Sequence, residues 1–183
     1  MSRLISLLTV FLISDIVVGQ AIEVQIQKIR NDYIEVRQYI NSDDEARFML
    51  DMTGAGGGLD YSFHTNANRL YLVEEEGGYE EGGTQQTEYY FNEANDLFFI
   101  YQKYDYINYF GGEHTYKELR VYVSNGKIIR QLIKEINSKD FDEVEEFKTS
   151  IDGIKNEEVE PSASDLTSNA KKLKEIWKIA NGL

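Results

Sequence analysis

Cysteine is absent from the 183-residue chain, and histidine occurs only twice. A chain without thiols forms no disulfide and no zinc–thiolate site, and it has no cysteine nucleophile. The histidines are His64, in a predicted turn, and His114, in a predicted loop, and neither has a partner at the spacing of a catalytic triad or a metal site. We therefore interpret both as surface histidines and expect a non-catalytic protein with no metal and no cofactor.

Long apolar runs are also scarce, because the first 21 residues hold the only one. "MSRLISLLTVFLISDIVVGQA" begins with a positive charge, continues with an apolar stretch and ends in small residues, which is the layout of a secretory signal peptide. Cleavage is expected after Gly19 or Ala21. The prediction is that residues 1–21 are removed and that the mature chain is secreted or periplasmic and not inserted in a membrane.

Positive charge is in short supply, since 19 Lys and Arg face 32 Asp and Glu for a net charge of −13. Such a surface repels phosphate backbones, so we expect no nucleic-acid partner. The lysines gather near the C-terminus, and pairing with the protein's own carboxylates is their simplest role.

A helix and three related hairpins account for most of the chain. In residues 22–40 apolar side chains recur every three or four positions, which predicts an amphipathic helix: Ile22, Ile26, Ile29, Tyr33, Val36 and Ile40. Period-two alternation then dominates to about residue 135. The segments "LDYSFHTNANRLYLV" (59–73), "TEYYFNEANDLFFIY" (87–101) and "LRVYVSNGKIIRQLI" (119–133) share one pattern, in which an aromatic-rich strand, a polar turn and a second apolar strand follow each other.

These segments predict an antiparallel sheet. The last turn contains Asn125-Gly126, the pair that best tolerates the positive φ angles of a type I′ turn. Three hairpins and "RFMLDM" (47–52) give a meander of about seven strands. Glycine-rich residues 53–60 are interpreted as a turn between strands, because no helix pattern or Lys-Ser/Thr pair follows them.

Helical periodicity returns after residue 136. Apolar positions from Phe141 to Ile154 predict one helix, and a connector follows at 156–162. A last helix begins with a capping box at Ser162 and ends at Gly182, with an apolar stripe formed by Leu166, Ala170, Leu173, Trp177 and Ala180. The predicted fold is therefore α+β. The predicted organisation is a helix-and-sheet domain at 22–155, with residues 156–183 packed on it and helices covering one face of the sheet.

Several of these motifs resemble a family of uncharacterised exported bacterial proteins. The resemblance rests on Ile29-Arg30, Tyr33 and Ile40-Asn41, on "GGGLDYSF" (56–63), and on "TEYYF" (87–91) with "SNGKIIRQLI" (124–133). It covers about residues 26–135 and leaves the last 48 unmatched. No activity is assigned to that family, so the resemblance implies a fold and no chemistry.

Two further stretches invite a functional interpretation. "EEEGGYEEGG" (74–83) concentrates carboxylates that can hold calcium, although a solvated loop is the simpler interpretation. "YQKYDYINYFGG" (101–112) is richer in aromatics than a loop requires. Tyrosine provides stiff contact area and stacks on sugar rings, whereas packing on the sheet is the alternative. The candidate ligand-binding residues are Tyr104, Tyr106, Tyr109 and Phe110.

The functional hypothesis is a non-catalytic binding module that recognises an envelope protein or a glycan through these aromatics and an uncovered sheet face. Two alternatives stay open: a hydrolase of polysaccharide or peptide that uses carboxylates, and a purely structural component of the envelope.

Overall fold

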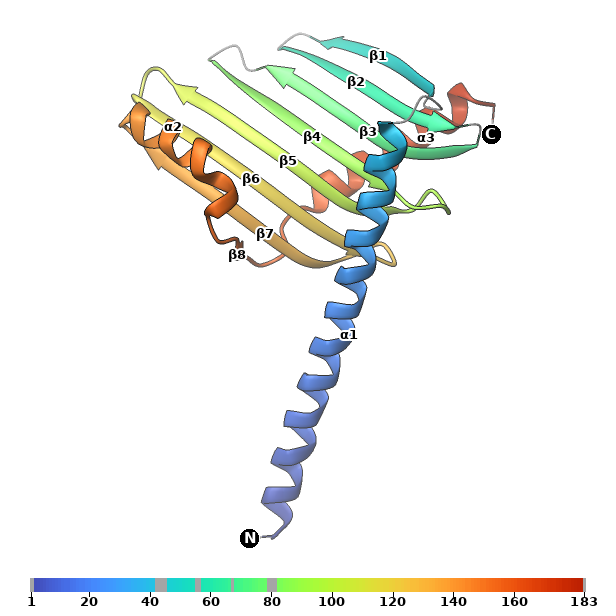
Figure 1. The fold of residues 1–183 in the computed structure, drawn as a ribbon, viewed down its shortest axis with the longest axis vertical. Helices are drawn as coiled ribbons and strands as arrows, with labels where there is room; N and C mark the ends of the chain where they lie inside the picture. The colour runs from blue at the N-terminus through green and yellow to red at the C-terminus, as the bar shows by residue number, and fades with distance from the viewer. Residues whose placement is uncertain (1, 42–45, 55–56, 67, 79–81, 183) are drawn as a thin grey trace.

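A single antiparallel sheet organises the computed structural model, which describes residues 2–41, 46–54, 57–66, 68–78 and 82–182. Its strands follow the chain in simple order: β1 (Ala46–Gly54), β2 (Gly57–Asn66), β3 (Arg69–Gly78), β4 (Gly83–Phe91), β5 (Leu97–Asn108), β6 (Glu113–Ser124), β7 (Lys127–Ser138) and β8 (Glu157–Glu158). The helices are α1 (Ser2–Ile40), α2 (Phe141–Ser150) and α3 (Ser164–Ala180), with a 3-10 turn at Ile151–Gly153 (Figure 1). The predicted α+β fold is confirmed, and β8 is a short addition to the expected seven-stranded meander.

Each of the three related segments forms a hairpin, and each hairpin carries a β-bulge beside its turn. The pairs are β2–β3, β4–β5 and β6–β7, and their registers shift between His64/Thr65, Tyr90/Phe91 and Tyr122/Val123. At each bulge the second strand inserts one residue that has no partner on the first strand. These extra residues are Tyr71, Phe98 and Ile129. The last turn has positive φ at both Asn125 (51°) and Gly126 (72°), as a type I′ turn requires.

The aligned bulges form the apolar surface on which α1 packs. A bulge re-aims a side chain, so that neighbouring residues of one strand share a face of the sheet. Phe98 and Phe99 accordingly both pack in the cluster beneath α1, as do Tyr71 and Leu72, and Ile129 lies at its border. Each copy of the hairpin therefore places one apolar bulge residue, Tyr71, Phe98 or Ile129, beneath α1.

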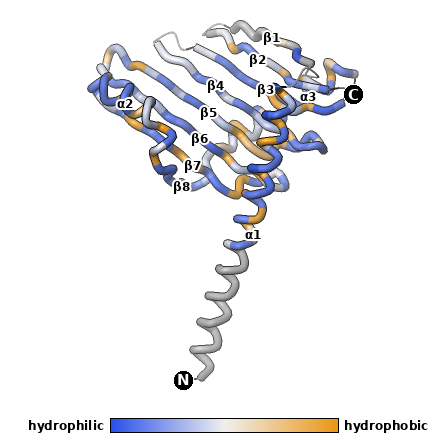
Figure 2. The backbone as a smooth tube through the Cα atoms, viewed as in Figure 1, coloured by the Kyte–Doolittle hydropathy of each residue, from blue (hydrophilic) through white to orange (hydrophobic). Residues whose placement is uncertain are grey.

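The apolar stripe predicted for residues 22–40 is the part of α1 that packs on this apolar surface. Ile26, Ile29 and Val36 are buried there, while Ile22, Tyr33 and Ile40 are partly buried. Figure 2 shows the apolar residues gathered where the helix crosses the sheet. Burial of an aliphatic side chain contributes about 1.5–3 kcal/mol, so this apolar contact holds the helix on the sheet in a chain that has no disulfides.

The opposite face of the sheet is covered by α3, which corrects the expectation that helices cover one face. Ala170, Leu173 and Trp177 pack against a second cluster that includes Phe63, Tyr89, Ile100 and Val121. The helix does not begin with the predicted capping box: its N-cap is Ala163, and Ser162 bonds to Gln131 of β7 instead. Gly182 follows the helix at φ 67°, as expected for a helix end.

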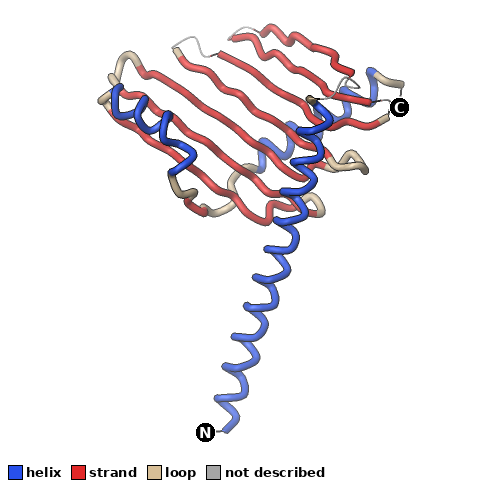
Figure 3. Tube along the Cα trace, viewed as in Figure 1, coloured by secondary structure: helices blue, strands red, loops and turns tan. Residues whose placement is uncertain are grey.

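Helix α2 lies on the same face as α1, over the far end of β6 and β7 (Figure 3). The ring of Tyr116 in β6 contacts that of Phe147 edge to face, with 6.3 Å between the ring centroids. Helix α2 ends at Ser150 rather than at the predicted Ile154. The chain then pairs β8 with β7 at the sheet edge and reaches the other face to begin α3. Two residues of the predicted connector, Glu157 and Glu158, thereby join the sheet.

Helix α1 is continuous through both expected cleavage positions, Gly19 and Ala21. No helix was found to be both long and apolar enough to cross a membrane within the described residues. Removal of residues 1–21 and export of the chain stay predictions.

Candidate functional site

Two of the four predicted site residues, Tyr104 and Tyr106, lie on β5 and form a stacked pair. Their ring centroids are 5.9 Å apart and their planes differ by 27°. Both side chains are half-buried. By strand alternation they share the face of β5 that carries Ile100, which is the face covered further along by α3. The expected alternation, with Tyr101, Lys103 and Asp105 on the other face, agrees with this arrangement.

The other two, Tyr109 and Phe110, lie in the tight turn between β5 and β6, which is shorter than the loop predicted for residues 101–112. Phe110 is 93% exposed and Tyr109 is 68% exposed. The side chain of Asn108 accepts the backbone N–H groups of Phe110 and Gly111 at 3.1 and 2.9 Å. The turn therefore presents its aromatic rings from a hydrogen-bonded backbone.

A glycine pair lies beside two of these residues, Tyr109 and Tyr106. The ring of Tyr109 lies so close to Gly82 that a Cβ there would meet it at 2.4 Å, and a Cβ on Gly83 would meet the Tyr106 ring at 3.2 Å. Both glycines have positive φ. We call Tyr104, Tyr106, Tyr109 and Phe110 the tyrosine strip. The glycines allow the aromatic rings to approach the backbone of β4.

Polar side chains border the tyrosine strip on the same face. Tyr104 pairs across the sheet with Gln85 on one side and Lys117 on the other, and Tyr106 pairs with Gly83 and Thr115. The rows continue into β7 with Glu135 and Asn137, both exposed. The sequence interpretation missed these bordering residues. The register of the hairpins identifies these residues, and that register follows only once the positions of the bulges are known.

Both histidines were wrongly interpreted as surface residues, because each is buried and bonded to a carboxylate on the neighbouring strand. His64 is 3% exposed and its Nε2 lies 2.7 Å from Glu74. His114 is 2% exposed, belongs to β6, and its Nε2 lies 2.6 Å from Asp105. Helix α2 adds Lys148, which pairs with the same Asp105 at 2.6 Å. These pairs join neighbouring elements on the face of α1 and α2, away from the tyrosine strip.

The electrostatics of these pairs favour ionised carboxylates. A hydrogen bond from His64 is the main cause that lowers the pKa of Glu74. Burial would raise the pKa of Asp105, but hydrogen bonds from Lys148 and His114 outweigh it, so that this pKa is lowered. Charged hydrogen bonds of this kind are the stronger class in proteins, which agrees with a structural role for both pairs.

The acidic segment 74–83 is only partly what the sequence predicts. Residues 79–81 lie outside the described residues, whereas Glu74 and Glu75 belong to β3. Glu75 is 4% exposed and accepts hydrogen bonds from Asn169 of α3, Tyr89 and Gln85. Burial, followed by the charge of Glu75, raises the pKa of Tyr61 to about 12. Within the described residues, no group of three or more possible metal ligands occurs.

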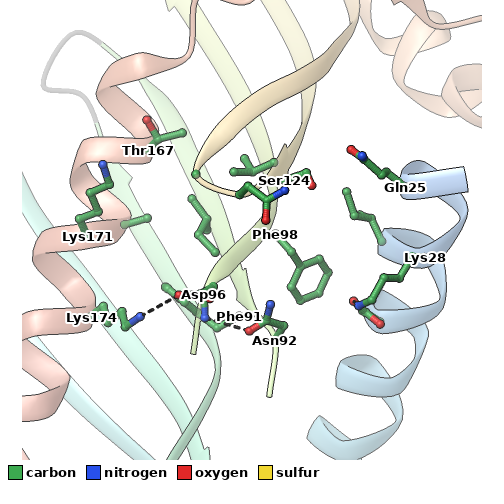
Figure 4. A pocket seen from close by; sticks show the side chains of 17 residues that line it. Gln25, Lys28, Phe91, Asn92, Asp96, Phe98, Ser124, Thr167, Lys171 and Lys174 are labelled. Atoms are coloured by element: carbon green, nitrogen blue, oxygen red, sulfur yellow. Dashed lines mark hydrogen bonds and ion pairs between the residues drawn. The ribbon is translucent and has the colours of Figure 1, made fainter. Parts of the chain in front are cut away.

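A groove of about 560 Å³, lined by both apolar and charged residues, lies between α1 and α3 at the end of the sheet where the hairpin turns meet (Figure 4). Lys28 comes from one wall and Lys171 and Lys174 from the other. Lys28 pairs with Asp32 at 2.5 Å and Lys174 with Asp96 at 3.4 Å. Because these pairs neutralise two of the three lysines, the groove has little charge left for a ligand.

Comparisons with protein-family models, with curated proteins and with solved structures found no match to this chain.

Proposed function

We propose that this protein is an exported, non-catalytic binding module that recognises a glycan through the tyrosine strip. The observation that carries the proposal is the stacked pair of Tyr104 and Tyr106 beside two strongly exposed aromatics. Exposed aromatic area of this extent is costly in water and marks recognition surfaces. The predicted signal peptide supports the export that such a role needs.

A glycan fits this surface in two respects. The C–H face of a sugar ring packs on an aromatic ring, and a nearly parallel pair of rings offers an extended platform for it. Sugar hydroxyls need hydrogen-bond partners, which Lys117 and Thr115 supply beside the rings. The sheet holds these groups at fixed spacings, so little conformational entropy is lost on binding.

A binding assay on immobilised bacterial and plant polysaccharides tests the proposal. The natural protein should be retained by at least one polysaccharide. A variant with Tyr104→Ala and Tyr106→Ala should lose retention and keep its cooperative unfolding. The matched control is Phe141→Ala, which removes an aromatic that is 43% exposed on the opposite face, and it should bind like the natural protein.

The same assay separates the alternatives. Release of soluble sugar from the retained polysaccharide would contradict a non-catalytic module and favour the hydrolase. Failure to be retained by any polysaccharide, together with capture of one envelope protein that the double variant does not capture, would favour protein recognition. If neither ligand class is bound, the tyrosine strip is a structural surface.

A further inference from the structure

A second concave site lies on the other face of the sheet, between α1 and strands β5 and β6. This cleft has a volume of about 490 Å³, within the range of small-molecule sites. We call it the aromatic cleft. It is lined by Ile29, Arg30, Tyr33, Ile34, Phe99, Tyr101, Arg120 and Tyr122. Nothing in the proposed glycan site uses these residues.

The floor of the aromatic cleft is apolar and already in place. The Phe99 ring lies 5.6 Å from Tyr33 in an edge-to-face contact and 5.2 Å from Tyr122. Phe99 and Tyr122 are buried at 7% and 6% exposure, whereas Ile34 at the rim is 53% exposed. An apolar chain entering here would cover Ile34 and meet rings that need no rearrangement.

Two guanidinium groups, those of Arg30 and Arg120, line the aromatic cleft in a chain of net charge −13. Arg120 donates to Glu118 at 3.1 Å and to Asn156, and its guanidinium lies 5.5 Å from the centre of the Tyr101 ring. Glu118 is itself 4% exposed and also accepts a hydrogen bond from Tyr116 at 3.3 Å. The buried Glu118 carboxylate therefore accepts its hydrogen bonds from Arg120 and Tyr116.

Arg30 is the more available cation of the two. It is exposed and forms no hydrogen bond or ion pair within the described residues, although its charge helps to lower the pKa of Glu23. Glu23 of the same helix is bonded instead to Arg130 at 2.6 Å. A free guanidinium above an aromatic floor matches a ligand whose apolar part ends in an anionic group.

We propose that the aromatic cleft binds a fatty-acid-like ligand, meaning one apolar chain with a single anionic head group. The chain lies on Phe99, Tyr101 and Tyr122, and the head group meets Arg30 with Arg120 behind it. This inference does not depend on glycan recognition, because the tyrosine strip lies on the opposite face of the sheet.

Titration calorimetry of the full chain with decanoate tests the proposal, with decanol as the uncharged match and decyl phosphate as the second anionic head group. One decanoate should bind per chain, and decanol should bind at least roughly tenfold more weakly, the loss expected for one charge-assisted hydrogen bond. Decanoate and decyl phosphate report which head group the arginines prefer, and binding of either supports the proposal.

Variants on exposed positions of α1 keep the test independent of folding. Arg30→Gln should weaken decanoate binding roughly tenfold and leave decanol unaffected. Ile34→Glu places a negative charge at the rim and should abolish binding, whereas Val24→Glu changes a side chain that is 71% exposed on the same helix and outside the cleft and should have no effect. Equal affinity for decanol and decanoate, no binding of either anion, or equal losses in Ile34→Glu and Val24→Glu would overturn the proposal.

Discussion

The packing of α3 on the sheet makes Leu173→Ala a direct test of the two-faced fold. Leu173 is 2% exposed within the cluster of Phe63, Tyr89 and Val121. Truncation of a buried leucine costs 2–5 kcal/mol, the lost transfer free energy plus the cavity that remains. We expect a loss of about 3 kcal/mol in the free energy of unfolding, because a helix packed on one side of a sheet relaxes in part into the cavity.

Trp177, the chain's single tryptophan, reports on this change. It is 1% exposed and lies one turn from Leu173, so unfolding in urea should shift its emission to the red. With a slope of about 2 kcal/mol per molar urea, the expected midpoint falls by about 1.5 M.

The matched control is Ile179→Ala on the same helix, where the side chain is 79% exposed. Surface substitutions usually change stability by less than about 0.5 kcal/mol, so its urea midpoint should stay close to that of the natural chain. If Leu173→Ala and Ile179→Ala shift the midpoint equally, α3 does not bury Leu173 against the sheet and the reasoning is refuted.

Two further predictions concern a turn and an ion pair. Gly126→Ala should lower the unfolding free energy by about 1–2 kcal/mol, because φ at this position is 72° and L-residues are strained there. Gly153→Ala, where a Cβ meets nothing within 4 Å and φ is ordinary, should have little effect on the melting temperature. Asp105 has a lowered pKa, so its stabilisation is present above the unfolded pKa of about 3.8 and is lost as pH falls through the folded pKa. Asp105→Asn should therefore lower the free energy of unfolding at pH 7 and make that free energy fall less steeply in acid, as measured by urea unfolding at each pH. An unchanged dependence on pH would contradict the proposed role of the Lys148–Asp105–His114 contact.

Local periodicity was sufficient to predict most of the elements, but it missed the short strand β8 and assigned residues 57–60 of β2 to a turn. The stripe from Ile22 to Ile40, the three hairpins and the Asn125-Gly126 turn depend on side-chain spacing and backbone φ preferences within one short segment. The aromatic candidates of β5 were predicted for the same reason, since their alternation follows from strand geometry.

Contacts between elements were not predictable in this way. The pattern of α3 shows that Leu173 and Trp177 are buried, but it does not state on which face of the sheet they pack. His64 and His114 were wrongly predicted to be at the surface because their carboxylate partners come from neighbouring strands. The burial of Glu75 was missed because its partner Asn169 is 94 residues away in the sequence. The aromatic cleft likewise combines α1 with β5 and β6.

The sequence by itself determined where most helices and strands lie and which side chains of each are apolar. The tertiary structure decided the bulge registers, the covering of both faces and the two candidate sites. The physical reason is that secondary structure depends on neighbours within a few residues, whereas burial, hydrogen-bond partners and clefts depend on which distant segments pack together.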